Sequence, residues 1–296
     1  MIIPCYHSHA TLPTCLESLR AQNHRDFEVI LVDSTPGDDR AMSMGSVYPF
    51  VRCCKSARRL SAHAARNEGA KHASGAILVF TDPDMRAHPE WLSRLCSQHG
   101  LEARMVGGGI DCLPGYFSHG VHMTKYGWWL AGGRAQRRPQ LPSGNLSVSR
   151  LAFERAGGFP ARFWAGDSEL CWHLRGLGYE LWLDPGAVLT HLHEPGPLEF
   201  VTERFTRGRD FGQARVLREH WGALRCAVQG MLLPAIPPLM AIKTGWFAAR
   251  TRNFSWWLVT LPVQLAGYAA WAAGEATAHG QAMLGIGRTE RPTTSG

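Results

Sequence analysis

The sequence lacks the cysteine patterns of a zinc domain or a redox motif. Its eight cysteines are scattered through 296 residues, none forms a C-x-x-C pair, and no Cys/His cluster has zinc spacing. We therefore expect reduced, mostly buried thiols in a cytosolic environment. No basic region followed by an apolar one opens the chain, so we expect no signal peptide. The apolar pair Ile2-Ile3 instead indicates that a strand begins almost at once.

Charged residues are also scarce, at 19% of the chain, yet their balance is basic. The 31 lysines and arginines outnumber the 24 acids and give a formal net charge of +7. An anionic partner is therefore expected, and nucleic acid, an acidic membrane surface and a phosphorylated substrate all match this sign. The length allows one large α/β domain with a smaller appendage.

Short apolar runs alternate with helical stretches over the first 112 residues. Strands are predicted at 2–5, 28–32, 50–53 and 76–80, because these runs are short, apolar and often β-branched. Helices are predicted around 12–19, at 62–73, and from Pro89 as a first helical position. The alternation is typical of an α/β protein with a mostly parallel sheet and helices on both faces. Ligands bind such sheets beyond the carboxyl ends of the strands, so the polar residues there are the functional candidates.

The sharpest candidate is a pair of carboxylates, Asp82 and Asp84, directly after the fourth predicted strand. On a continuing strand, residues i and i+2 face the same side. Two carboxylates in that arrangement suit Mg²⁺ or Mn²⁺, which also bind phosphate oxygens. A turn is the simpler explanation of an isolated Asp-x-Asp, but the position at a strand end favours a metal site.

Two further polar residues extend this candidate site. Asp33 follows the second predicted strand, and Arg66 precedes the strand that leads to Asp82. Taken singly, Asp33 could cap a helix and Arg66 could be a solvated charge. Together with the acid pair, they predict a nucleotide pocket.

Two residues of the second half of the domain are weaker candidates. Asp167 lies near a predicted helix start, where capping alone would explain a negative charge. His191 follows a strand predicted at 181–183, and a lone histidine there is more often structural than a ligand. Residues 115–142 are predicted to be an irregular surface excursion, and pocket shape around 107–145 is expected to set the choice of ligands.

The C-terminal third is basic and then apolar. Residues 199–225 predict a basic amphipathic helix or pair of helices. Its arginines could attract anionic lipid headgroups or a lipid diphosphate, or they could equally be a solvated face. Of the apolar stretches that follow, 254–274 has no charge and is long enough to span a bilayer, whereas 226–249 contains three prolines and Lys243. A hairpin would place Arg250 and Arg252 on the wrong side, which favours a re-entrant or interfacial arrangement. The alternative is a buried helical pair packed on the catalytic domain, and the tail is expected to be disordered.

An ordered set of short motifs resembles glycosyltransferase family 2, which has the GT-A fold. The motifs are Ile-Ile-Pro-Cys-Tyr at 2–6, Val-Asp-Ser-Thr at 32–35, Ala-Arg-Asn-Glu-Gly at 65–69, Asp-Pro-Asp at 82–84, Gly-Asn-Leu at 144–146, Gly-Gly-Phe at 157–159 and Asp-Ser-Glu-Leu-Cys-Trp at 167–172. The resemblance covers about the first 195 residues. It implies a GT-A domain at 1–197, followed by a basic helical segment at 198–225, a hydrophobic membrane-associated region at 226–286 and a tail at 287–296.

The resemblance implies a role for each matching residue. The donor would be a nucleoside-diphosphate sugar, with a divalent metal, Mg²⁺ or Mn²⁺. In the nucleotide pocket, Asp33 would contact the base or ribose, Pro4 and Tyr6 would shape the pocket, and Arg66 would lie near the base or diphosphate. Asp82, Asp84 and His191 would bind the metal, with Asp84 favoured as the direct ligand. Asp167 would be the catalytic base.

The implied reaction is transfer of a single sugar with inversion, in which Asp167 takes the acceptor proton. The Gln-x-x-Arg-Trp element of processive synthases is missing. Gly166 replaces the glutamate usual before the base, and Ser34 replaces a second acid, which leaves the nucleotide open. We expect a lipid- or glycan-linked acceptor at the cytoplasmic face of the membrane.

Two other functions have to be weighed. A nucleotidyltransferase would carry a glycine-rich basic loop after the first strand, and the sequence at 7–10, His-Ser-His-Ala, is unlike one. A non-catalytic nucleotide-sugar-binding scaffold is disfavoured by the retained acids. Nucleic acid is not an expected partner, because the arginines adjoin apolar helices rather than interleaved stacking aromatics.

Overall fold

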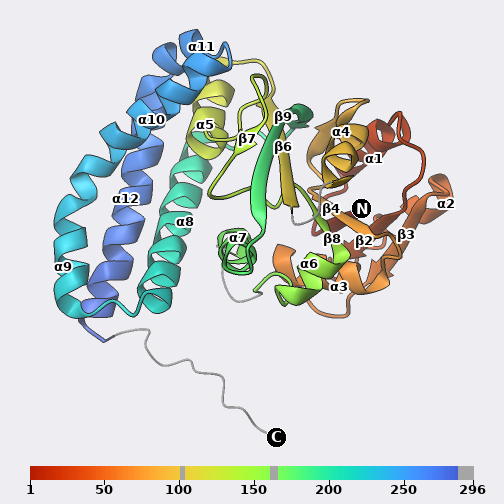
Figure 1. Ribbon diagram of the computed structural model, residues 1–296, viewed down its shortest axis with the longest axis horizontal. Coiled ribbons are helices and arrows are strands. Elements are labelled where there is room, and N and C mark those ends of the chain that lie inside the picture. Colours follow the sequence, from red (N-terminus) through yellow and green to blue (C-terminus); the bar gives the residue numbers. More distant parts are fainter. Residues whose placement is uncertain (101–103, 161–165, 286–296) are drawn as a thin grey trace, which may run out of the picture.

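The computed structural model describes residues 1–100, 104–160 and 166–285. The tail at 287–296 that was predicted to be disordered, and the residues directly before Gly166, lie outside these ranges. The described chain has an α/β fold, with a mixed sheet that carries helices on both faces and a helical unit at one end (Figure 1).

The sheet has nine strands in the described residues, in the order β3-β2-β1-β4-β8-β6-β9-β5, with β7 paired to β9. The strands are β1 (Ile2–Cys5), β2 (Val29–Asp33), β3 (Val51–Lys55), β4 (Ile77–Thr81), β5 (Met85–Ala87), β6 (Arg104–Cys112), β7 (Gln136–Arg137), β8 (Asn145–Ser149) and β9 (Glu180–His191). Strands β1 to β4 are parallel to one another, as predicted. Strand β8 runs antiparallel between β4 and β6, so the second half of the sheet is mixed.

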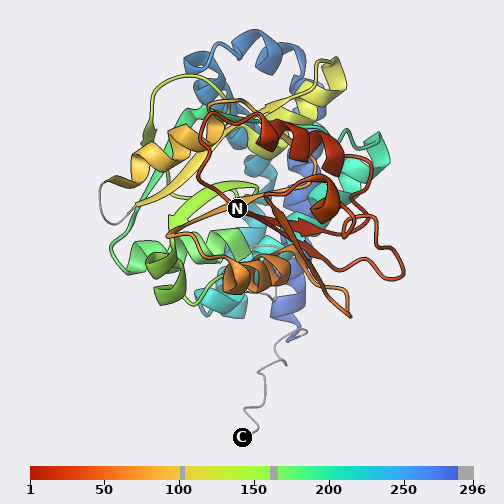
Figure 2. The same ribbon diagram turned by 90° about the vertical axis from the view of Figure 1, so that its right-hand side faces the viewer.

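Two apolar cores, one on each face, hold the helices against the sheet. Alternate residues of β1 face opposite sides, so Ile3 joins one core and Ile2 the other. One core packs α1 (Leu12–Arg20) and α4 (Trp91–Ser97), with α2 (Met44–Val47) at its margin, and the other packs α3 (Ala62–His72), α6 (Arg150–Arg155) and α7 (Gly166–Gly176). Figure 2 shows these helices around the N-terminal strands, with the C-terminal helices behind.

Three predictions of local structure are wrong. Helix α4 begins at Trp91 rather than at Pro89, because Glu90 serves as its N-cap. The strand predicted at 181–183 runs on to His191, which therefore ends β9 instead of following it. The excursion predicted at 115–142 contains an eleven-residue helix, α5 (Tyr116–Tyr126), whose middle is buried against the C-terminal helices.

The C-terminal unit is a layered set of helices. Its members are α8 (Pro197–Arg218), α9 (Ala223–Leu232), the 3₁₀ turn η2 (Leu233–Ala235), α10 (Ile236–Arg250), α11 (Phe254–Val259) and α12 (Leu261–Met283). Helix α12 lies between α8 and the outer pair α9–α10 (Figure 1). Helices α8 and α12 approach closely at glycines, because a Cβ on Gly208 would lie 2.1 Å from the carbonyl oxygen of Trp271, and one on Gly274 would lie 2.1 Å from that of Phe205.

The basic helix predicted at 199–225 is real, but its arginines are not a free solvated face. Arg204 is buried with its guanidinium 4.5 Å from the ring centre of Trp271. Arg218 stacks at 4.1 Å on Trp172 of α7, which ties α8 to the catalytic domain. Aromatic rings of the chain itself thus hold two of the arginines for which lipid contact and a solvated face were the alternatives.

The two apolar stretches differ from what their composition suggests. Stretch 254–274 is interrupted at Thr260, and its longer part, α12, is packed against α8. Within the described part of the chain, one helix is long and apolar enough to cross a membrane, the continuous run Ala223–Arg250, and only 17% of its most apolar window is buried. Its prolines introduce a 3₁₀ turn and do not end the helical path.

Candidate active site

Asp33 is held at the carboxyl end of β2, next to Cys5 at the end of β1. Its buried carboxylate accepts a hydrogen bond from the backbone N–H of Thr35 at 3.0 Å and pairs with the Lys55 ammonium at 2.8 Å. Lys55 ends β3, so it is a strand-end residue that the sequence analysis passed over. The paired charge keeps Asp33 fixed at this edge of the sheet.

Asp82 is held by Arg66, which reaches it from α3. The two side chains form an ion pair in which the guanidinium is buried and the carboxylate is about one third exposed. Gly144 lies against the other side of Asp82, where a Cβ would come within 2.5 Å of Oδ2. The glycine of the Gly-Asn-Leu motif therefore leaves room for this carboxylate.

Asp84 and His191 form the second half of the acid site. The Nε2 atom of His191 lies 3.3 Å from Oδ2 of Asp84, and the Leu192 N–H donates to the Asp84 carbonyl at 2.8 Å. Burial opposes ionisation of Asp84, but the hydrogen bond and charge of His191 outweigh it and lower its pKa. A carboxylate and an imidazole nitrogen side by side form a donor set that fits a divalent cation such as Mn²⁺.

Asp167 lies in the first turn of α7 and is half-buried. Its Oδ1 accepts the N–H of Ser168 at 2.8 Å, a local contact of the kind expected at a helix start. Burial raises the pKa of Asp167, against the opposing charges of Arg207 and Arg66. Because Arg66 also pairs with Asp82, its positive charge acts on both Asp82 and Asp167.

A wall of helical residues that sequence reasoning missed faces the same site. Tyr126 of α5 stacks near His191 with ring centres 5.5 Å apart, and burial together with the charges of Asp84 and Asp82 raises its pKa. Glu203 of α8 joins the ammonium of Lys125 at 3.0 Å and the guanidinium of Arg207 at 2.8 Å. The arginine richness of this segment was visible in the sequence, but nothing local showed that Arg207 turns toward Asp167.

The remaining predicted residues lie at the rim and in the sheet. Tyr6 is partly exposed, and the Arg59 guanidinium stacks 4.4 Å from its ring centre. Pro4 is buried in β1 opposite Val32. Burial raises the pKa of the Cys5 thiol, and the charges of Asp33 and Asp82 raise it further. Asp33 ends β2 and Asp82 follows β4, the two strands that flank β1, so the two acids lie at neighbouring strand ends.

A small pocket lies beside His191. Its wall is formed by α5 and by the segment after β9. Its lining side chains include Cys112, His122, Lys125, Tyr126, His191 and His193.

Comparison with known proteins identifies the family. The model of glycosyl transferase family 2 matches residues 1–152, just over half of the 296-residue chain. Glycosyltransferase AglE of Haloferax volcanii is 27% identical over 203 residues, which cover 66% of this chain and 64% of AglE. Polypeptide N-acetylgalactosaminyltransferase 15 of Mus musculus is 29% identical over 216 residues, which cover 63% of this chain and 33% of the mouse protein. The chain thus spans less than two thirds of either relative.

A solved structure agrees with this in fold. The mannosyltransferase PcManGT from Pyrobaculum calidifontis, solved with GDP-Man and Mn²⁺, has a TM-score of 0.57 and 18% identity, and the match covers 89% of this chain and 86% of that one. At this identity the likeness concerns the fold alone. Taken with the family match, it shows that the chain has the GT-A fold and belongs to glycosyl transferase family 2.

Proposed function

We propose that the protein is an inverting glycosyltransferase that moves a single sugar from a nucleoside-diphosphate sugar to a hydroxyl acceptor. The observation that carries the proposal is the ion pair of Arg66 with Asp82, because the charge of Arg66 also acts on Asp167. Asp84 is linked to the same group through Tyr126, on which the charges of Asp84, Asp82 and Arg207 all act. A single displacement at the anomeric carbon requires a base on the side opposite the leaving group, and Asp167 would be that base.

The donor would lie along the carboxyl ends of β1, β2 and β4. Asp33 offers its carboxylate to the ribose or base, with Lys55 holding that carboxylate in place. Tyr6 and Arg59 form a stacked pair at the rim that would cover the base, while Pro4 shapes the floor. Arg66 would contribute positive charge near the diphosphate while it orients Asp82.

Asp84 and His191, with Asp82 beside them, would hold the divalent metal. When bound, Mg²⁺ or Mn²⁺ supplies positive charge against the diphosphate as it leaves. The cation named with the PcManGT structure is consistent with this choice. Lys125 lines the pocket beside His191, and Lys125 and Arg207 are both paired with Glu203.

Asp167 would act as the base. Its carboxylate accepts the proton of the acceptor hydroxyl while the oxygen attacks the anomeric carbon. The raised pKa of Asp167 makes it a stronger base than a solvated aspartate, and the charges of Arg207 and Arg66 oppose that rise. The configuration of the transferred sugar is inverted because there is one displacement.

We further propose that the acceptor is lipid- or glycan-linked and that the enzyme works at the cytoplasmic face of a membrane. The support is an apolar surface on α9, α10 and α11. Its exposed side chains are Leu224, Val228, Met231, Leu232, Leu239, Ile242, Trp246, Phe254, Leu258 and Val259. An apolar face of this extent on a soluble monomer is unusual, and interfacial docking would cover it.

A donor screen tests the reaction. Purified protein is incubated with nucleotide sugars, Mn²⁺ and candidate acceptors, and nucleoside diphosphate is measured as product. We expect donor-dependent release of nucleoside diphosphate that Asp167→Asn and Asp84→Ala abolish and Glu68→Gln, in an exposed ion pair, leaves unchanged. Release of pyrophosphate would identify a nucleotidyltransferase instead. Binding of nucleotide with no turnover in the unmutated protein would favour the scaffold.

A further inference from the structure

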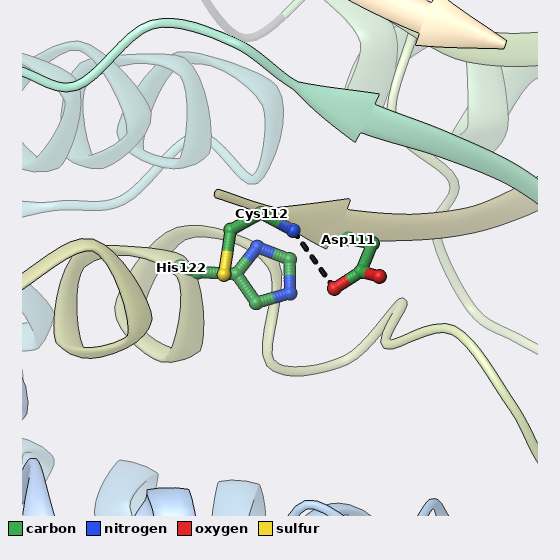
Figure 3. Close-up of side chains that lie close together, drawn as sticks. All are labelled: Asp111, Cys112 and His122. Carbon is green, nitrogen blue, oxygen red and sulfur yellow. Dashed lines mark hydrogen bonds between the residues drawn. The ribbon is translucent and has the colours of Figure 1, made fainter. Parts of the chain in front are cut away.

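Three side chains with metal-ligand atoms meet at the junction of β6 and α5. Asp111 and Cys112 are the last two residues of β6, and His122 faces them from α5 (Figure 3). The ligand atoms of all three lie within 4.8 Å of one another. The Cys112 N–H donates to one Asp111 carboxylate oxygen at 2.9 Å, which leaves the second oxygen of that carboxylate available.

His122 adds an independent sign of a missing ligand. It is only 4% exposed, and its Nδ1 atom has no hydrogen-bond partner among the described residues. A buried polar atom left unpaired costs about 1–3 kcal/mol, so such atoms normally have a partner. Burial, with the charges of His191 and His119, lowers the pKa of His122 to about 3. The imidazole is therefore neutral, the form that binds a metal.

Cys112 complements it chemically. Burial and the charge of Asp111 raise the pKa of the Cys112 thiol to about 12. A divalent cation between these groups would supply the opposing charge, and its binding would release the thiol proton to solvent. Thiolate and imidazole donors favour Zn²⁺ over Mg²⁺ or Mn²⁺, which prefer oxygen.

We propose that Asp111, Cys112 and His122 form a Zn²⁺ site that is separate from the acid site of Asp84 and His191. Three protein ligands leave one position for water or a further ligand on the pocket side. The cation would fasten the end of β6 to α5, the helix that carries Lys125 and Tyr126 into the active site. The proposal does not depend on the transfer reaction.

Metal binding to the full-length protein tests the site. Chelator-treated protein is titrated with Zn²⁺ alone, and in parallel with Co²⁺ to detect the charge-transfer band of a cobalt–thiolate bond. We expect Cys112→Ser to abolish that band and to weaken Zn²⁺ binding by roughly tenfold or more, as does loss of a supporting group at known sites. Asp111→Asn should also weaken Zn²⁺ binding.

Two matched variants decide between this site and others. Cys54→Ser removes a half-exposed thiol on β3, and Asp84→Ala removes the acid-site ligand; both should keep the cobalt band. His122 is buried and its variants could misfold, so the test rests on Cys112 and Asp111, with circular dichroism as the folding control. Zn²⁺ binding that is absent, that survives both Cys112→Ser and Asp111→Asn, or that only Asp84→Ala removes would overturn the proposal.

Discussion

At the scale of single residues, Asp167 gives the clearest pH prediction. The acceptor proton can move only to ionised Asp167, and burial raises the pKa of this group. The rate should therefore fall as pH drops, through a range above that of an ordinary aspartate. Asp167→Asn should lower kcat by about 10²–10⁴-fold and remove that acid limb. The measurement is kcat/KM against pH. If kcat/KM of Asp167→Asn still fell at low pH as it does in the wild type, another group would be the base.

Glu203 gives a prediction about stability. Burial opposes its ionisation, but the charges of Lys125 and Arg207 lower the pKa of Glu203 to about 2. Glu203→Gln strands the buried ammonium of Lys125 and should cost about 2 kcal/mol, below the roughly 3–5 kcal/mol of a fully buried pair because Glu203 is partly exposed.

The sign of the pH dependence follows from the lowered pKa. The stabilisation is fully present above about pH 4.3, the unfolded value, and is lost as pH falls toward 2. Denaturant unfolding of the wild type and Glu203→Gln should therefore converge at low pH. Glu68→Gln, in an exposed pair with Lys71, is the control and should change stability by at most about 0.5 kcal/mol. An equal effect of the two variants would contradict the buried-pair assignment.

At the scale of elements, the sequence predicted the first four strands because each is a short apolar run followed by a polar residue. That pattern also located Asp33, Asp82 and Asp84. Strand β6 was not recognised, since it contains three consecutive glycines, 107–109, which pack where a Cβ would collide with neighbouring atoms. Helix α5 was missed because polar and small residues are mixed with its apolar ones, so its sequence shows no clear apolar face. Its middle is buried only through packing against the C-terminal helices.

The same limit explains the missed site residues. Tyr126, Arg207 and His122 lie on helices, and only tertiary packing turns them toward the strand ends. The sequence shows no Cys/His cluster with zinc spacing, but spacing describes only residues that are close along the chain. Cys112 and His122 are brought together by a strand, a turn and a helix, which no short spacing pattern describes. The roles of Asp167 and His191 remain predictions from the resemblance.

The crossing of α8 and α12 supports a further prediction. Gly274→Ala would place a methyl group 2.1 Å from the Phe205 carbonyl, so the helices must separate. We expect a loss of at least about 1–3 kcal/mol, the usual cost of overpacking. Gly280→Ala, in the same helix with open space around it, should be neutral or stabilise by up to about 1 kcal/mol. Thermal unfolding of the two variants makes the comparison, and equal melting temperatures would mean that the crossing is loose.

At the scale of the whole molecule, membrane docking can be tested without truncation. Removing 226–296 would strip α12 from α8 and expose a packed interface, so surface substitutions are the better probe. Leu224→Ser combined with Met231→Ser alters two side chains of α9 that are each 80% exposed. Since a buried leucine or methionine contributes about 1.5–3 kcal/mol, binding to anionic vesicles should fall at least about tenfold.

The control changes two equally apolar residues on the catalytic domain, Val47→Ser with Leu177→Ser. Flotation with vesicles should leave this variant bound like the wild type. If both double variants lose binding alike, or neither does, the surface of α9 and α10 is not the docking face.

Helix α8 carries Glu203 and Arg207 on one flank, and its Gly208 packs closely against α12. The helix therefore joins the residues proposed for the reaction to the helical unit proposed for membrane docking. Grafting the last third of this polypeptide onto another transferase would bring both charged side chains with it, so we expect chimeras that keep the recipient's own counterpart of α8 to stay active where simple tail exchanges fail.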